Sequence, residues 1–204
     1  MPVAEASIYL AKTQGRSSWK NALTMGGGTF FIALAAGYGS QFFLGKITSI
    51  ILSFALLLFI ILAGIIFDII GVATAAASEA PLNARAAKRI PGARQALRLL
   101  RKADRVTTFC NDVVGDASGT LSGAVGAVII LRLAGQHGAE DILISTITTA
   151  VIAAVTVGGK AMGKSFALRE ANEVVFFVGR VLYAIERLTG WQPIPNGPRK
   201  GRRP

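Results

Sequence analysis

The chain has 204 residues, of which 52% are hydrophobic and only 16% are charged, and its mean hydropathy is +0.52. This composition excludes an ordinary soluble globule and indicates an integral membrane protein. The 22 Lys and Arg residues outnumber the 11 Asp and Glu residues, and the formal net charge is +11. In a soluble chain this excess would indicate a nucleic-acid partner. Because the charges here lie between apolar runs, we expect membrane lipids as partners and no nucleic acid.

Residues 1–46 are predicted to form a cytoplasmic N-terminus followed by an extra transmembrane helix over 21–43. Its glycines lower helix propensity, although membrane helices tolerate glycine better than soluble ones do. The alternative is a cleaved signal sequence, since Lys12, Arg16 and Lys20 form a basic flank before an alanine-rich stretch.

Residues 47–67 carry no charge and are numerous enough to cross about 30 Å of hydrocarbon. Two further spans are predicted over 106–131 and 142–157. The fold class is therefore an all-α integral membrane protein with about four transmembrane helices. All basic residues except Lys46 and Arg132 fall on one side of these spans. The positive-inside rule then predicts a multi-pass protein of the cell (inner) membrane with both termini in the cytoplasm.

The segment between the second and third spans is predicted to be an amphipathic helical hairpin, which Pro91 and Gly92 divide. Its apolar positions have helical spacing: Ala86, Ile90, Ala93, Leu97 and Leu100. Basic residues cover the other side: Arg85, Lys88, Arg89, Arg94, Arg98, Arg101 and Lys102. Of these, Arg94, Arg98, Arg101 and Lys102 are predicted to form a lipid-facing basic belt. The alternative is a cytoplasmic loop that packs against nothing, which would leave the apolar positions exposed.

After the last span, a juxtamembrane amphipathic helix is predicted on the cytoplasmic side. Its apolar positions are Val174, Phe177, Val178, Val181, Ile185 and Leu188. The sequence does not decide whether this helix lies on the membrane or packs against a partner subunit. Residues 191–204 form a basic, proline-rich tail that anionic lipid would attract.

Acidic residues inside apolar segments are costly and are candidates for function. Asp68, Asn111, Asp112 and Asp116 are the candidate metal ligands. Without an intramembrane Lys or Arg partner, three carboxylates favour protonation or a bound cation, and oxygen ligands suit Mg²⁺. Interfacial solvation, polar contacts between helices and a proton relay are the alternatives.

Small residues accompany these acids on a predicted helical stripe. The stripe consists of Asp112, Gly115, Asp116, Gly119, Ser122, Gly123 and Gly126. Gly115, Gly119 and Gly123 repeat at four-residue spacing and are predicted to let a second helix approach closely. The second span offers a matching stripe of Gly64, Asp68, Gly71, Ala75 and Ser78.

Enzymatic chemistry is not expected from this sequence. Cys110 is the single cysteine and His137 the single histidine, so neither a disulfide, a zinc cluster nor a Cys/His pair is predicted. No nucleophile–base pair or metalloprotease motif is present.

The order of these features resembles the transmembrane domain of the CNNM/CorB/CorC magnesium transporter family. Two stretches carry the resemblance: FDIIGVATAAASEAPLNARAAKRIPGARQALRLLRKADRVTTFCNDVVGD and GGKAMGKSFALREANEVVFFVGRVL. The resemblance covers about 47–188, so the domains are predicted as 1–46, 47–190 for the CNNM/CorB-like core, and 191–204. It implies a homodimer that transports or binds Mg²⁺ and possibly Co²⁺, with Asp68 and Asn111 standing where that family has polar ligands.

Two departures bear on this implied function. Gly159, Lys160, Gly163 and Lys164 replace a family junction that usually carries a Glu and a Pro. The family's CBS-pair regulatory module has no counterpart in these 204 residues. Besides cation transport, the sequence therefore leaves open a non-transporting dimeric membrane scaffold or regulator that binds anionic lipid or a partner protein.

Overall fold

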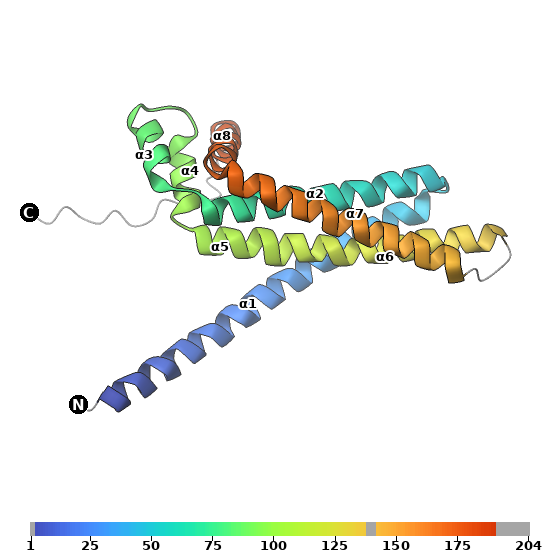
Figure 1. The fold of residues 1–204 in the computed structure, drawn as a ribbon, viewed down its shortest axis with the longest axis horizontal. Coiled ribbons are helices and arrows are strands. Elements are labelled where there is room, and N and C mark those ends of the chain that lie inside the picture. Colours follow the sequence, from blue (N-terminus) through green and yellow to red (C-terminus); the bar gives the residue numbers. More distant parts are fainter. Residues whose placement is uncertain (1–2, 138–141, 191–204) are drawn as a thin grey trace, which may run out of the picture.

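The computed structural model describes residues 3–137 and 142–190, and it gives no side-chain placement for 3–18, 20–22, 134–137, 142 and 144. Within these residues the secondary structure is entirely helical (Figure 1). The elements in chain order are α1 (Val3–Lys46), α2 (Ile50–Ala76), α3 (Glu79–Ala87), α4 (Ala93–Leu100), α5 (Ala103–Thr107), the π-helix η1 (Thr108–Gly115), α6 (Asp116–His137), α7 (Ile142–Arg169) and α8 (Ala171–Thr189). The expected all-α class is confirmed for this part of the chain.

Three helical segments among the described residues are long and apolar enough to cross a membrane: Ile50–Ala76, Ala103–Leu133 and Ser145–Arg169. The chain is therefore a membrane protein in which α2, the α5–η1–α6 rod and α7 form the spanning bundle. The fourth span predicted over 21–43 lies inside α1, which is not among the three. Figure 1 shows α1 leaving the bundle at an angle.

The bundle has two different ends. At one end lie α3, α4 and α8, together with the last turns of α2 and α7 and the start of α5 (Figure 1). We call this the basic end because Arg85, Arg94 and Arg101 lie there. Its buried apolar cluster contains Ala73, Leu82, Ala96, Leu97, Leu99, Ala167, Ala171 and Val175.

At the other end, Arg132 of α6 joins the α1–α2 connection to the bundle. Its guanidinium donates hydrogen bonds to the carbonyl oxygen of Ile47 at 2.7 Å, to the Ser53 hydroxyl at 3.1 Å and to the carbonyl oxygen of Leu44. The last carbonyls of a helix have no partner within the helix. Arg132 therefore satisfies groups that would otherwise be costly to bury in an apolar bundle.

The hairpin packs against protein. Two short helices, α3 and α4, lie on either side of the turn at 88–92, and α4 packs along α8. Ala93 and Leu97 are buried as the apolar spacing predicts, but Ile90 is 38% exposed and Leu82 is fully buried instead. The apolar positions of α4 thus cover α8, so neither a membrane surface nor an unpacked loop is needed to explain them.

The predicted apolar stripe of α8 differs from the face that packs inside the chain. Ala171, Val175 and Gly179 are the buried positions of α8, because small residues let it approach α4 closely. Phe177, Val181, Ile185 and Leu188 of the predicted stripe are exposed. α8 therefore has two apolar faces, one buried by α4 and one open.

Candidate functional site

An ion pair joins two of the spanning helices inside the bundle. The Lys160 ammonium of α7 lies 3.1 Å from Oδ2 of Asp68 on α2. The side chains are 20% and 5% exposed, respectively, so both charges are shielded from the surroundings. Asp68 lies eight residues before Ala76, about 12 Å along the axis at about 1.5 Å per residue. The pair thus lies within two of the helical segments that are long and apolar enough to cross a membrane, Ile50–Ala76 and Ser145–Arg169.

The backbone of the third helix completes this site. Lys160 donates a second hydrogen bond, 2.9 Å long, to the carbonyl oxygen of Gly115 at the end of η1. A Cβ atom on Gly115 would come within 2.2 Å of Oδ1 of Asp68, so only glycine allows the carboxylate to lie against this backbone. The ammonium therefore connects all three spanning helices at one point.

Glycines of α7 bring Lys160 into reach of Asp68. A Cβ on Gly159 would lie 2.5 Å from Cδ1 of Ile65, and one on Gly163 would lie 3.0 Å from Cγ1 of Ile69. The residues predicted as an altered family junction, Gly159, Lys160, Gly163 and Lys164, therefore lie inside one continuous helix, α7. The chain turns only at Glu170, between α7 and α8.

Asn111 lies beside the ion pair in the same helix interface. A Cβ on Gly71 would lie 2.1 Å from Oδ1 of Asn111, so α2 and η1 touch here too. This oxygen is buried and has no hydrogen-bond partner in the part of the chain that the structure describes. Nearby, the Thr107 hydroxyl donates to the carbonyl oxygen of Gly71 at 3.1 Å. The site thus contains one buried acceptor whose hydrogen-bonding capacity is unused.

The four predicted ligands do not gather on one face of the helices. Asp112 and Asp116 are exposed, whereas Asp68 is buried and Asn111 is largely buried. The predicted single stripe divides into two neighbouring faces of the helix. Gly115, Ser118, Ser122 and Gly126 are buried, whereas Asp112, Asp116 and Gly123 are exposed.

The small-residue contacts lie on the buried face. Gly64 meets Ser118, Asp68 meets Gly115, and Gly71 meets Asn111. Gly119 and Gly123 are predicted to support helix packing, but no other helix of the described chain places an atom within 4 Å of where their Cβ would lie. Of the three predicted glycines, only Gly115 therefore makes a close contact between helices.

The expectation that no basic side chain would accompany the acids is also wrong, because Lys160 neutralises Asp68. Among the described residues, no three His, Cys, Asp or Glu side chains lie close enough to hold a metal ion together. Cys110 is buried and unpaired. The structure places Asp68 and Asn111 in one helix interface and leaves Asp112 and Asp116 exposed, and the assignment of these four residues as metal ligands stays a prediction.

The predicted lipid-facing belt divides into paired and exposed residues. Arg98 donates hydrogen bonds to both carboxylate oxygens of Glu186, at 2.6 and 2.8 Å, and both side chains are 14% exposed. Gln95 donates to the same carboxylate at 2.8 Å. Arg98 therefore holds α4 against α8. Arg94 and Arg101 are exposed, whereas Lys102 is only partly exposed.

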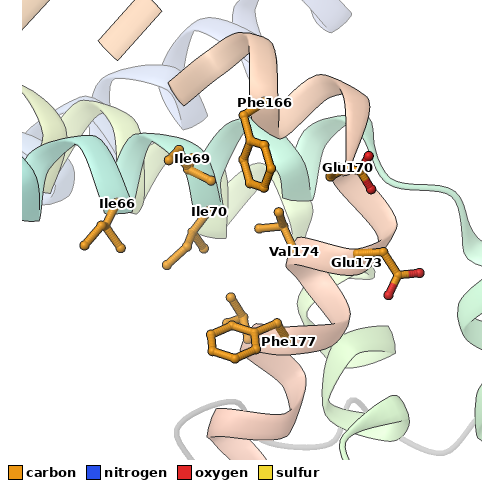
Figure 2. A pocket seen from close by; sticks show the side chains of 9 residues that line it. Ile66, Ile69, Ile70, Phe166, Glu170, Glu173, Val174 and Phe177 are labelled. Atoms are coloured by element: carbon orange, nitrogen blue, oxygen red, sulfur yellow. The ribbon is translucent and has the colours of Figure 1, made fainter. Parts of the chain in front are cut away.

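An apolar groove of about 610 Å³ lies where α8 crosses α2 and the end of α7. Figure 2 shows Ile66 and Ile70 facing Phe166 and Phe177 across it, while the carboxylate of Glu173 points away. Glu173 instead accepts a bidentate interaction from Arg85 of α3. This hydrogen bonding lowers the pKa of Glu173 and raises that of Arg85. The groove is thus apolar where Ile66, Ile70, Phe166 and Phe177 line it.

Sequence reasoning missed Lys160 as the partner of Asp68. The span was predicted to end at residue 157, before Lys160, and only the helix ends in the structure place Asp68 eight residues before the end of α2 and Lys160 nine residues before the end of α7. Two helices that run in the same direction place such charges at the same depth, where intramembrane charges pair with one another.

Comparison with known protein families, with curated proteins and with solved structures gave no match.

Proposed function

We propose that this protein is a non-transporting scaffold or regulator in the cell membrane. Its basic end faces the cytoplasm and recruits anionic lipid. The observation that carries the proposal is the contact of Lys160 with Asp68 and Gly115. A protonated lysine already supplies the positive charge that a lone buried carboxylate would take from a cation. The Asp68 site is therefore complete without an ion and serves to hold three helices together.

The exposed surface of the basic end supports the second half of the proposal. Lys88, Arg94 and Arg101 are exposed, and none of them takes part in an ion pair among the described residues. Exposed basic residues beside a membrane attract anionic headgroups, by about 1 kcal/mol for each Lys or Arg near the surface. The CNNM/CorB/CorC resemblance further implies a homodimer, which we include in the proposal.

The decisive experiment compares lipid retention and ion flux in one set of variants. The protein is reconstituted in a mixture of phosphatidylglycerol and phosphatidylcholine, and retained lipid is counted by native mass spectrometry. Lys88→Gln with Arg101→Gln should reduce phosphatidylglycerol retention, whereas Asp112→Asn with Asp116→Asn should not. Proteoliposomes loaded with a Mg²⁺-sensitive dye should show no flux of Mg²⁺, Co²⁺ or Mn²⁺. Flux that Asp68→Asn abolishes would contradict the proposal.

Divalent cation transport, with Mg²⁺ as the substrate, is the second candidate. The buried and unpartnered Oδ1 of Asn111 beside Asp68 favours it, because an amide oxygen and a carboxylate are ligands that Mg²⁺ accepts. For this function Lys160 must first leave Asp68. Lys160→Met should then increase Mg²⁺ flux, whereas in a scaffold it only weakens the bundle.

A further inference from the structure

The turn between α3 and α4 has an unusual residue at its tightest point. The N–H of Arg89 bonds to the carbonyl oxygen of Ala86 at 3.0 Å, and the N–H of Ile90 bonds to that of Arg85 at 3.1 Å. These two bonds define a Schellman motif, whose left-handed position glycine normally occupies. Here Arg89 occupies it with φ of 56°. A large side chain in this conformation is unfavourable, so the guanidinium itself needs a reason to be there.

Arg89 lines a pocket of about 350 Å³ at the amino end of α4. Arg94 and Tyr183 line the same pocket, so two arginines and a tyrosine border one space. Neither Arg89 nor Arg94 pairs with a carboxylate among the described residues. The nearest acid on α8, Glu186, is already held by Arg98 and Gln95. The pocket therefore carries uncompensated positive charge.

The backbone adds to this charge. α4 begins at Ala93 after Gly92, and no side chain caps its amino end. The Ala93 N–H bonds to the carbonyl oxygen of Ile90 at 3.2 Å, but the first turn of α4 contains no acidic residue, and the positive end of the helix dipole favours an anion. The start of α4 and the two arginines that line the pocket therefore both favour an anion at this place.

Contacts between glycines fix the pocket in place. A Cβ on Gly92 would lie 2.7 Å from the Arg180 backbone, and one on Gly179 would lie 2.5 Å from the carbonyl oxygen of Gly92. The turn is therefore pressed against α8. Tyr183 follows Gly179 by one helical turn, which places the phenol on the same side of α8 as the pocket.

We propose that this pocket binds a phosphate group, either the phosphodiester of an anionic lipid headgroup or a soluble phosphate ester. Arginine is the side chain best suited to phosphate oxygens, because its planar fork donates two parallel hydrogen bonds. The Tyr183 hydroxyl donates a further bond, and the start of α4 provides backbone donors. This inference deepens the proposed recruitment of anionic lipid by giving it one saturable site.

The test measures binding to the full chain in phosphatidylcholine nanodiscs. The probes are short-chain phosphatidylglycerol, glycerol phosphate and inorganic phosphate, titrated by calorimetry. Arg89→Gly with Arg94→Gln should weaken binding about tenfold or more, because each charge-assisted hydrogen bond contributes that order of affinity. Arg105→Gln with Arg187→Gln removes the same charge from exposed positions outside the pocket and should leave affinity unchanged.

The same variants provide a control for folding. Arg89→Gly places glycine at the left-handed position and should leave the thermal stability equal to or higher than that of the wild type. Saturable binding of short-chain phosphatidylglycerol alone identifies a lipid headgroup site, and equal binding of glycerol phosphate identifies a soluble ester. Equal loss in the pocket and control variants, or no saturable binding of any probe, would overturn the inference. Phosphatidylglycerol retention that persists without saturable binding would leave the proposed function standing while this inference fails.

Discussion

Lys160 and Asp68 form an ion pair between two parallel spanning helices, with 3.1 Å between the ammonium nitrogen and the carboxylate oxygen. Each helix carries this one charge within an otherwise apolar stretch of its buried surface. The Gly115 carbonyl oxygen accepts the second hydrogen bond of the ammonium. Because every partner comes from a different helix, the pair fixes both the rotation and the depth of α2, η1 and α7 relative to one another.

Removing one partner of this pair should cost more than removing both. Lys160→Met leaves the Asp68 carboxylate buried without a counter-charge, which is expected to destabilise the bundle by about 3–5 kcal/mol. The double variant Lys160→Met with Asp68→Asn should recover most of that loss. The measurement is the unfolding midpoint in mixed micelles across a denaturing-detergent titration. A single variant as stable as the wild type would show that the pair does not form.

Much of this fold is predictable from the sequence, since an uncharged run marks the α2 span and an apolar stretch with few charges marks the α5–η1–α6 span. The length of α7 is not predictable from the sequence. A lysine at position 160 indicates the start of a cytoplasmic segment, unless it is known that Asp68 pairs with it. Helical periodicity also does not place Asp112 and Asp116, since each follows a residue of the packed face, Asn111 or Gly115, and the rotation of the helix decides which of two neighbouring faces is buried. In this site, the partner of an intramembrane charge and the register of its helix are both set by tertiary contacts.

The faces of α8 illustrate the same limit. The periodicity identifies Phe177, Val181 and Leu188 as an apolar stripe, and those residues are indeed on one side of the helix. The chain buries the face with Val175 and Gly179 instead, because close approach to α4 requires small residues. Hydrophobicity therefore predicted an amphipathic helix, whereas side-chain size determined which face packs.

The close contact between α2 and α6 predicts opposite effects for two glycines. A Cβ on Gly64 would lie 1.9 Å from Oγ and 2.9 Å from Cβ of Ser118, so rotating the hydroxyl cannot relieve the clash. Gly64→Ala should destabilise the protein by about 1–3 kcal/mol. A Cβ on Gly123 would meet no atom within 4 Å, and Gly123→Ala gains as much helix propensity as Gly64→Ala does. Gly123→Ala should therefore stabilise the protein slightly. Unfolding midpoints of the two variants measured together test this, and equal midpoints would contradict the described packing.

The Arg98–Glu186 interaction should govern how firmly the hairpin is held. Glu186→Gln removes the charge that faces a guanidinium only 14% exposed, so we expect a loss of about 1.5–3 kcal/mol. Amide hydrogen exchange in α4 should accelerate accordingly. Glu173→Gln serves as the matched control, because its partner Arg85 is more exposed and α3, not α4, would be affected. Faster exchange in α4 from both variants alike would rule out a specific role for Glu186.

The Arg85–Glu173 pair should make α3 sensitive to acid. The hydrogen bond from Arg85 lowers the pKa of Glu173 below its ordinary value of 4.5. Because the folded-state pKa is the lower one, the stabilisation is present above about pH 4.5 and is lost as the pH falls through the folded-state value. Since Glu173 is 57% exposed, solvent screening limits the contribution to about 0.2–1 kcal/mol.

The pH dependence of the unfolding midpoint tests this contribution. At about neutral pH the unfolding midpoint of the wild type should be higher than that of Glu173→Gln. The two midpoints should converge in acid as Glu173 becomes protonated. Raised salt should also narrow the difference, because surface pairs are screened. Glu170→Gln changes an exposed acid outside any ion pair of the described residues and should follow the wild-type curve. A constant gap between wild type and Glu173→Gln at every pH would assign the stabilisation to packing of the side chain instead of its charge.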